Sequence, residues 1–424
     1  MPASRPGAGP SPQRWVVLAA YMLLTLAVEV QWVALAPVAR AAQRFYAPGG
    51  GPLPDVDLLA LSYLLVYLVA CVPASYVIDT YGIRRGLGAG ALLAAAGGLL
   101  KGLLAGSFQA VLAGQLLLAL AQPFVLNAAT AVAARWFPLR ERGLANGLAA
   151  LAQYLGIVGA MVIGPLVVVG DAASPHYGEG VDRLLLGYGL VTVVCAAAAL
   201  LLVPERPAHP VEGGEERLGA LEGMRALLAG RDYRLLLLLF TAGLGIFNAL
   251  SSMVDAVAAH IGVSDSDGLL GTFMIGGGIL GALVLPVASD AVGRRKPFLV
   301  LCMAGMVPGV AGLAFADAIA STPAGAYSVA KASAALLGFF VMSAGPIGFQ
   351  YAAEIGRPAP ESTSQGLLLL AGQASGIAFM LVMQTPRLVG PVLAVFAVLS
   401  VGCLAGATVL RESKVMTSHL GERT

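Results

Sequence analysis

The stretch PASYVIDTYGIRRG (Pro73–Gly86) joins two apolar runs, and PVASDAVGRRKP (Pro286–Pro297) joins two others about half a chain later. Each stretch places an aspartate, a glycine three residues on and then a basic cluster in a short turn. The turn residues are Asp79, Gly82, Arg84 and Arg85 in the first copy and Asp290, Gly293, Arg294 and Arg295 in the second. A motif that recurs at this separation predicts a chain built from two repeated halves.

The composition indicates a membrane protein. The 424 residues are 58% hydrophobic and 11% charged, whereas soluble domains average about 45–50% apolar and about 25% charged residues. Apolar runs of about 18 residues or more recur along the chain, and each is long enough to cross a membrane as a helix. We therefore predict an all-α membrane protein with twelve transmembrane helices in two six-helix halves. The predicted spans are approximately 15–41, 58–79, 84–105, 108–134, 141–170, 182–203, 233–260, 268–290, 297–318, 325–350, 362–386 and 388–411.

The polar intervals predict the domain organisation. We expect an N-terminal half at 1–203, a cytoplasmic linker at 204–232, a C-terminal half at 233–411 and a cytoplasmic tail at 412–424. The linker carries leucines and a methionine at the spacing of an interfacial amphipathic helix, namely Leu218, Leu221, Met224, Leu227 and Leu228. Most of the 25 Lys and Arg residues fall on one side if the N-terminus is cytoplasmic. This predicts a multi-pass protein of the cytoplasmic (inner) cell membrane with both termini in the cytoplasm.

Other classes of function find little support. The four cysteines lie in apolar runs without metal-ligand spacing, so we expect them to pack in the core. The four histidines form no catalytic or metal-binding pattern, and the basic residues are confined largely to the predicted turns, which disfavours nucleic-acid binding. We predict no enzyme activity, no metal and no cofactor. The expected partners are the lipid bilayer, a small-molecule substrate and, as a candidate coupling ion, protons; we expect a monomer.

The paired turns resemble the signature loop of the major facilitator superfamily, Gly-x-x-x-Asp-Arg-x-Gly-Arg-Arg. Thr80 and Ala291 replace the arginine after the aspartate, and Ser75 replaces the leading glycine. The resemblance implies a secondary transporter that works by alternating access, in which these charges hold the inner ends of neighbouring helices. An aspartate in such a turn could also cap a helix N-terminus through its dipole.

Three further blocks are similar to the feline leukaemia virus subgroup C receptor branch of this superfamily. They are QWVALAPVARAAQRFY (31–46), AQPFVLNA (121–128) and GFFVMSAGPIGFQYAAEIGRPAPESTSQGLLLLAGQASGI (338–377). Members of this branch carry choline, ethanolamine or related solutes and have been linked to haem. The resemblance implies that Trp32 and Gln373 occupy substrate-binding positions. It aligns Tyr154, with Gln153 beside it, to a binding glutamine, and Asn248 to a cation-facing tyrosine, so the implied aromatic cage is incomplete.

Glu29 is an acidic residue inside the first apolar run, three residues before Trp32 and therefore on the same helical face. A carboxylate attracts a cation, and an indole offers it a π-face. Gln31, beside Trp32, completes the substrate-binding candidates. Asp255 is a second deep acid, seven residues after Asn248 and on nearly the same face of the predicted span. An intramembrane carboxylate must pair, bind a proton or face water, so Glu29 and Asp255 are candidates for proton or cation binding.

Three functions remain open. The first is transport of a small organic solute, an amine or a choline-like quaternary ammonium compound, by alternating access. The second is proton-coupled transport of a neutral or anionic metabolite, with Glu29 or Asp255 carrying the proton. The third is a membrane sensor or receptor that binds a solute without moving it. Five other polar residues in the spans are expected to bond between helices instead of touching substrate, namely Tyr63, Tyr67, Gln122, Asn127 and Gln350.

Overall fold

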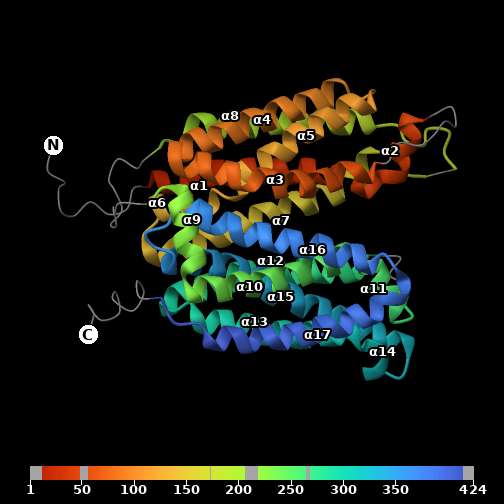
Figure 1. Ribbon diagram of the computed structural model, residues 1–424. Coiled ribbons are helices and arrows are strands. Elements are labelled where there is room, and N and C mark those ends of the chain that lie inside the picture. The colour runs from red at the N-terminus through yellow and green to blue at the C-terminus, as the bar shows by residue number, and fades with distance from the viewer. Residues whose placement is uncertain (1–11, 48–55, 172, 206–217, 264–267, 414–424) are drawn as a thin grey trace. The chain divides into compact units, whose positions relative to one another are not determined.

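The structure is a computed structural model that describes residues 12–47, 56–171, 173–205, 218–263 and 268–413 (Figure 1). Within these ranges twelve helical segments are long and apolar enough to cross a membrane, and no strand occurs. The prediction of an all-α membrane protein with twelve transmembrane helices is therefore confirmed. Residues 206–217 of the predicted linker and 414–424 of the predicted tail lie outside the described residues.

The helices pack into two compact units. Unit 1 consists of residues 1–137 and 152–214, and unit 2 consists of residues 138–151 and 215–424. The packing therefore groups 138–151 with unit 2, although these residues precede the predicted linker in the chain. As a result the single helix α7 (Arg142–Val167) begins in unit 2 and continues in unit 1.

Unit 1 is built around α4, which packs against both α5 and α8. Its elements besides α7 are α1 (Gln13–Trp32), η1 (Ala36–Val38), α2 (Ala39–Tyr46), α3 (Asp57–Tyr81), α4 (Ile83–Leu103), α5 (Phe108–Leu126), α6 (Ala129–Trp136) and α8 (Val181–Leu202). Small residues permit this packing, because a Cβ atom on Gly97 of α4 would lie 2.6 Å from the carbonyl oxygen of Gly114 on α5. The glycines of this run therefore bring backbones together.

Unit 2 repeats this plan with α13, which packs against both α15 and α17, and α12 also packs along α15. Its elements are η2 (Leu139–Glu141), the start of α7, α9 (Ala220–Ala229), α10 (Arg231–Ser252), α11 (Val254–His260), α12 (Leu269–Val292), α13 (Lys296–Ala314), α14 (Ala316–Ile319), α15 (Pro323–Ile355), α16 (Glu361–Met383) and α17 (Pro386–Val409). Figure 1 shows α13, α15 and α17 running alongside one another. A Cβ atom on Gly338 of α15 would lie 1.8 Å from the Met274 carbonyl oxygen on α12, so this contact requires glycine.

Two spans are broken toward one end. α1 stops at Trp32, and the chain continues through η1 into α2. α10 stops at Ser252, and α11 begins at Val254 after Met253. The predicted span at 233–260 is therefore interrupted, so Asn248 and Asp255, predicted on nearly the same face of one span, lie on different helices. Asp255 lies near the start of α11.

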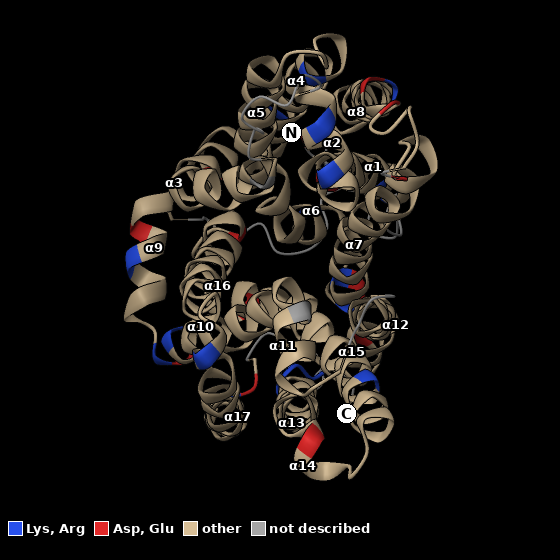
Figure 2. Ribbon diagram, turned by 90° about the vertical axis from the view of Figure 1, so that its right-hand side faces the viewer, with Lys and Arg blue, Asp and Glu red and all other residues tan. Residues whose placement is uncertain are grey.

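The surface of the long helices is apolar. Val69, Leu201 and Val398 are 78%, 83% and 72% exposed, as expected of side chains that face lipid. Viewed along the helices in Figure 2, red and blue segments mark short elements such as α2, α9 and α14, and the long helices are largely tan. The four cysteines are buried, which confirms their predicted place in the core.

The short helix α9 lies in the segment for which we predicted an amphipathic helix. It buries Gly223 and Leu227 and exposes Leu221 and Leu228. The space beside Gly223 is filled by Pro360, since a Cβ atom at 223 would lie 2.5 Å from the proline ring. That α9 lies at a membrane surface stays a prediction.

Candidate functional site

Glu29 is fully buried at the middle of the first span, with no exposed surface. Its Oε1 atom accepts a hydrogen bond from Gln122 Nε2 of α5 at 3.2 Å. Its Oε2 atom has no hydrogen-bond partner among the described residues. Gly156 of α7 packs so closely that a Cβ atom there would lie 2.9 Å from Glu29 Cβ. One oxygen of a buried carboxylate thus lacks a donor, which is unfavourable unless a proton, a cation or water supplies one.

Trp32 lies one helical turn further along α1, at the break. Its indole Nε1 donates to the Ala60 carbonyl oxygen of α3 at 3.0 Å. Its ring stacks on Tyr63 with centroids 6.3 Å apart and an interplanar angle of 25°. Tyr63 is buried and Trp32 is half-buried. α1 and α3 therefore present an aromatic pair with part of the indole uncovered, one turn from the Glu29 carboxylate.

Other polar residues of unit 1 take different positions. Gln31 Nε2 donates to Thr192 Oγ1 of α8 at 3.1 Å, so this side chain packs between helices, and we leave it out of the proposed site. Tyr154 and Gln153 are half-buried on α7.

Hydrogen bonds between helices were predicted for a set of polar residues, and several are present. Tyr67 donates to Asn127 Oδ1 at 2.6 Å, and Asn127 Nδ2 donates to Ser75 Oγ at 2.9 Å. Gln122 bonds Glu29, as described above. These side chains connect α1, α3 and the end of α5 within unit 1, so the predicted hydrogen bonds between helices are confirmed.

In unit 2 the two substrate-binding candidates bond to each other. Asn248 Nδ2 of α10 donates to Gln373 Oε1 of α16 at 3.1 Å, and both side chains are half-buried. Gly376 allows α10 and α16 to pack this closely, because a Cβ atom at position 376 would lie only 2.8 Å from Asn248 Cβ. The pair is neutral and offers one amide nitrogen and one amide oxygen for further hydrogen bonds.

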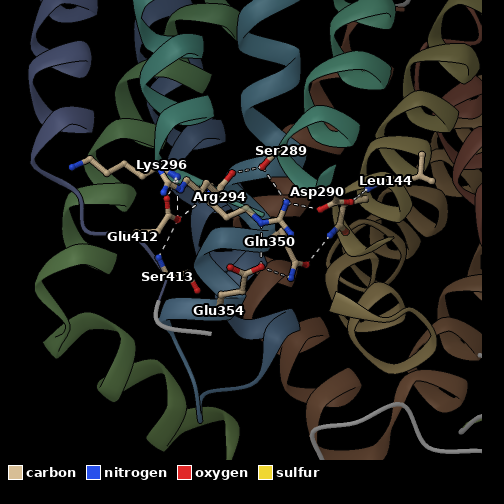
Figure 3. A network of polar contacts seen from close by, with 11 residues as sticks. Leu144, Ser289, Asp290, Arg294, Lys296, Gln350, Glu354, Glu412 and Ser413 are labelled. Carbon is tan, nitrogen blue, oxygen red and sulfur yellow. Dashed lines mark hydrogen bonds and ion pairs between the residues drawn. The ribbon is translucent and has the colours of Figure 1, made fainter. Parts of the chain in front are cut away.

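The second of the repeated turns is the centre of a buried charge network (Figure 3). Arg295 Nη1 lies 2.5 Å from Asp290 Oδ1, and Arg295 Nε lies 3.2 Å from Glu354 Oε1 of α15. The three side chains are 0%, 5% and 1% exposed. Burial lowers the pKa of the Arg295 guanidinium, but the Glu354 and Asp290 carboxylates outweigh this effect, so its pKa is raised above the ordinary value.

The same network holds the start of α7. Asp290 Oδ2 accepts from the Leu144 backbone N–H at 2.7 Å, at the positive end of the α7 dipole. Asn146 donates to Gln350 at 3.2 Å, and Gln350 donates to Glu354 at 2.9 Å. Asp290 therefore binds both an arginine of its own turn and the N-terminus of a neighbouring helix.

The first of the repeated turns is more open. Gly82 adopts a φ of 99°, a conformation that favours glycine. Glu205, which follows α8, accepts from the backbone N–H groups of Ile83 and Arg84 at 3.2 and 2.9 Å and forms an ion pair with Arg135. A cavity of about 740 Å³ opens beside the turn and is lined by Asp79, Thr80, Tyr81, Gly82, Arg84, Arg85, Arg135, Leu200 and Glu205.

Sequence reasoning missed three acidic residues of these turns. Glu412, which follows α17, accepts from the backbone N–H groups of Arg295 and Lys296 at 2.9 and 3.3 Å. Glu205 does the same for α4, so each half places a glutamate after its last span to cap its third span. That internal repeat was a usable signal in the sequence. Glu354 gave no such signal, because its partner Arg295 is 59 residues away.

The repeated six-helix plan, the paired turns and the polar residues within the spans define a class of membrane transporter. The chain belongs to the Major Facilitator Superfamily, whose family model matches residues 17–381. It is therefore a transporter of that superfamily, and the predicted membership is confirmed.

Relatives and solved structures agree with this assignment. The chain is 32% identical over 384 residues to solute carrier family 49 member A3 of Danio rerio, covering 88% of this chain and 78% of that protein. It is 25% identical over 381 residues to the choline/ethanolamine transporter FLVCR2 of Homo sapiens, covering 87% and 71%. The fold matches the proton:xylose symporter XylE with a TM-score of 0.75 at 16% identity, over 96% of this chain and 98% of that one. The predicted resemblance to the FLVCR branch is thus confirmed.

Proposed function

We propose that this protein carries a small amine or choline-like quaternary ammonium solute across the cytoplasmic membrane by alternating access, with both termini in the cytoplasm. The observation that carries the proposal is the Glu29 carboxylate, which is fully buried, held by one amide and left with Oε2 unpaired. Among possible ligands, a cation gains the most binding free energy from contact with such a carboxylate oxygen. No described side chain already neutralises it.

Trp32 supplies the second element of the proposed recognition. An indole face that is partly uncovered binds a quaternary ammonium group by cation–π attraction, which contributes about 2 kcal/mol when desolvated. Tyr63 stacks on that indole and holds its plane. Relatives named as choline/ethanolamine transporters support the same substrate class. On unit 2 the candidate substrate contacts are the amides of Asn248 and Gln373.

The two turns serve the transport cycle in this proposal. Asp290 holds the Leu144 N–H at the start of α7, and this bond must break if the start of α7 leaves unit 2. A buried hydrogen bond that is present in one arrangement of the helices and absent in the other gives a transporter two discrete states instead of a continuum. We assign this role to the charged turn residues and no substrate contact to them.

Proton coupling is a second candidate function, and the same unpaired Glu29 oxygen favours it. A carboxyl group buried without a cation binds a proton more readily, because burial disfavours its charged form. In that case Glu29 would carry the proton, and the solute would be neutral or anionic.

Uptake into proteoliposomes separates these functions. Wild-type protein is reconstituted and uptake of labelled choline is measured, with ethanolamine as competitor and a protonophore added in parallel. We expect uptake that ethanolamine inhibits and that Trp32→Ala reduces by about tenfold, while Trp15→Ala, at the exposed start of α1, has little effect. Choline binding without flux would support a sensor and contradict transport. Uptake of a neutral or anionic solute that the protonophore abolishes would support proton coupling.

A further inference from the structure

Lys101 is a basic residue in the core of unit 1 that the proposed function does not use. It is 1% exposed and lies on α4, within a segment that can cross a membrane. Its Nζ atom donates to the Gln31 carbonyl oxygen at 3.0 Å and to Gln115 Oε1 of α5 at 2.5 Å. No carboxylate among the described residues pairs with it. A lysine buried in a membrane span without an opposite charge is costly, which calls for a specific role.

The break in α1 supplies the acceptors that this lysine and its amide partner bind. α1 ends at Trp32, and the Ala36 N–H bonds to the Val33 carbonyl oxygen at 3.1 Å. In a continuous α-helix that N–H would bond to the carbonyl of Trp32. The Trp32 carbonyl accepts instead from Gln115 Nε2 at 3.2 Å. The last carbonyl groups of α1 are thus satisfied by side chains of α4 and α5, as a helix end within a membrane requires.

Lys101 also fixes which way the Gln115 amide faces. A lysine ammonium only donates, so Gln115 must turn its oxygen toward Lys101 and its NH2 group toward acceptors. That NH2 group donates to the carbonyl oxygens of Trp32 and Leu59, the latter at 3.0 Å. The Trp32 indole donates to Ala60, the next residue of α3. The Trp32 side chain is therefore bonded directly to α3, and its backbone carbonyl is linked to the same turn of α3 through the Gln115 amide.

We propose that Lys101 and Gln115 are positioning residues that hold Trp32, at the break in α1, in the orientation in which it contacts the transported solute. The contact between Trp32 and solute rests on the proposed function. The positioning itself rests on the hydrogen bonds from α4 and α5 to the last turn of α1. Neither Lys101 nor Gln115 touches the solute in this account, and both act through Trp32.

The test uses full-length protein in which Trp15→Phe and Trp136→Phe leave Trp32 as the only tryptophan. Two variants are made in that background: Lys101→Met removes the ammonium donors, and Gln115→Glu keeps an acceptor for Lys101 but loses the NH2 group. The control Lys331→Met removes a half-buried lysine of unit 2 that lies 4.6 Å from the Tyr327 ring. The emission maximum of Trp32, its quenching by acrylamide and the dissociation constant for choline are measured.

Both test variants should shift the Trp32 emission, increase its quenching and raise the choline dissociation constant by about tenfold, while Lys331→Met changes none of these. The inference would be overturned if a test variant that elutes as a monodisperse peak kept the Trp32 emission maximum and the acrylamide quenching of the parent protein. This result would overturn it even if that variant no longer bound choline. If both spectra change but the wild type binds neither choline nor ethanolamine, the positioning role stands and the proposed substrate class fails.

Discussion

In unit 1 the buried charges Glu29 and Lys101 lie within long spans and bond only to neutral groups, whereas in unit 2 Asp290, Arg295 and Glu354 lie around the second turn and bond to one another. Both sets are almost completely buried. Each set leaves one carboxylate oxygen without a donor among the described residues, Glu29 Oε2 and Glu354 Oε2. Their partners differ, because Asp290 and Glu354 share the positive charge of Arg295, whereas Glu29 bonds only to the neutral amide of Gln122.

The polar groups within the spans of unit 2 sharpen this contrast. There the amides of Asn248 and Gln373 bond to each other and carry no charge. A paired buried charge stabilises one arrangement of helices, and an unpaired buried carboxylate gains free energy from a cationic ligand. We therefore assign charge recognition to unit 1 and control of the transport cycle to the paired charges of unit 2.

Arg295→Met should have the largest effect on stability. It leaves the Asp290 and Glu354 carboxylates buried without their cation, which lowers the free energy of unfolding by about 3–5 kcal/mol. Thermal unfolding in detergent should show a fall in Tm of about 10 °C. The matched control is Arg294→Met, which removes the neighbouring exposed arginine. Equal Tm values for the two variants would contradict the assignment of stabilising charge to this network.

Glu29→Gln should have the largest effect on ligand binding. It keeps the shape of the side chain and removes its charge, so the choline dissociation constant should rise by about 30-fold. Calorimetric titration measures this constant. Glu205→Gln removes a carboxylate of the same unit near the first turn, and it should leave choline affinity unchanged. Equal losses in the two variants would mean that net charge, and not the Glu29 position, governs binding.

Gln373→Ala tests the neutral pair of unit 2. Losing one neutral hydrogen bond from the Gln373 amide to the solute removes about 0.6 kcal/mol of binding free energy, so choline affinity should fall by only about threefold. The same titration measures the change. A loss larger than that of Glu29→Gln would reverse the proposed division of recognition between the units.

Glu205→Gln should give the smallest effect, and it acts on stability. Glu205 is 37% exposed and Arg135 is 19% exposed, so their ion pair and the cap on α4 together contribute about 0.5–1 kcal/mol. The loss in Tm should shrink in high salt, because salt screens exposed charges. The Tm loss of Arg295→Met should persist in high salt. If the Tm loss of Glu205→Gln did not depend on salt, the Glu205 carboxylate would be as well shielded from solvent as the Arg295 guanidinium.

The fold could be predicted from the sequence because its signals are local. Apolar length sets each span, and the Asp-Gly-basic spacing of Asp79–Arg85 and Asp290–Arg295 marks the same turn in both halves. Glu29 was found for the same reason, since one acid in an apolar run is visible without knowing its neighbours.

The rest depends on partners distant in the chain. Glu205 caps a helix that begins 122 residues earlier, and Lys101 meets Gln31 from 70 residues away. No proline or glycine lies between Gly245 and the break after Ser252, so a continuous span was the natural expectation. Gln31 was predicted beside the substrate, but its bond to Thr192 depends on how α8 packs.

The central claim is that the solute is recognised by its positive charge at Glu29. The most direct test compares the thermal stabilisation of the purified protein by choline and by 3,3-dimethyl-1-butanol, its neutral isostere of the same shape, because a ligand that binds the folded state raises Tm. We expect choline to raise the Tm of the wild type, Glu29→Gln to reduce that rise strongly at the same choline concentration, and the isostere to have little effect on either. Equal stabilisation of the wild type by the two compounds, or a choline-induced rise in Tm that is undiminished in Glu29→Gln, would contradict recognition of the charge at Glu29.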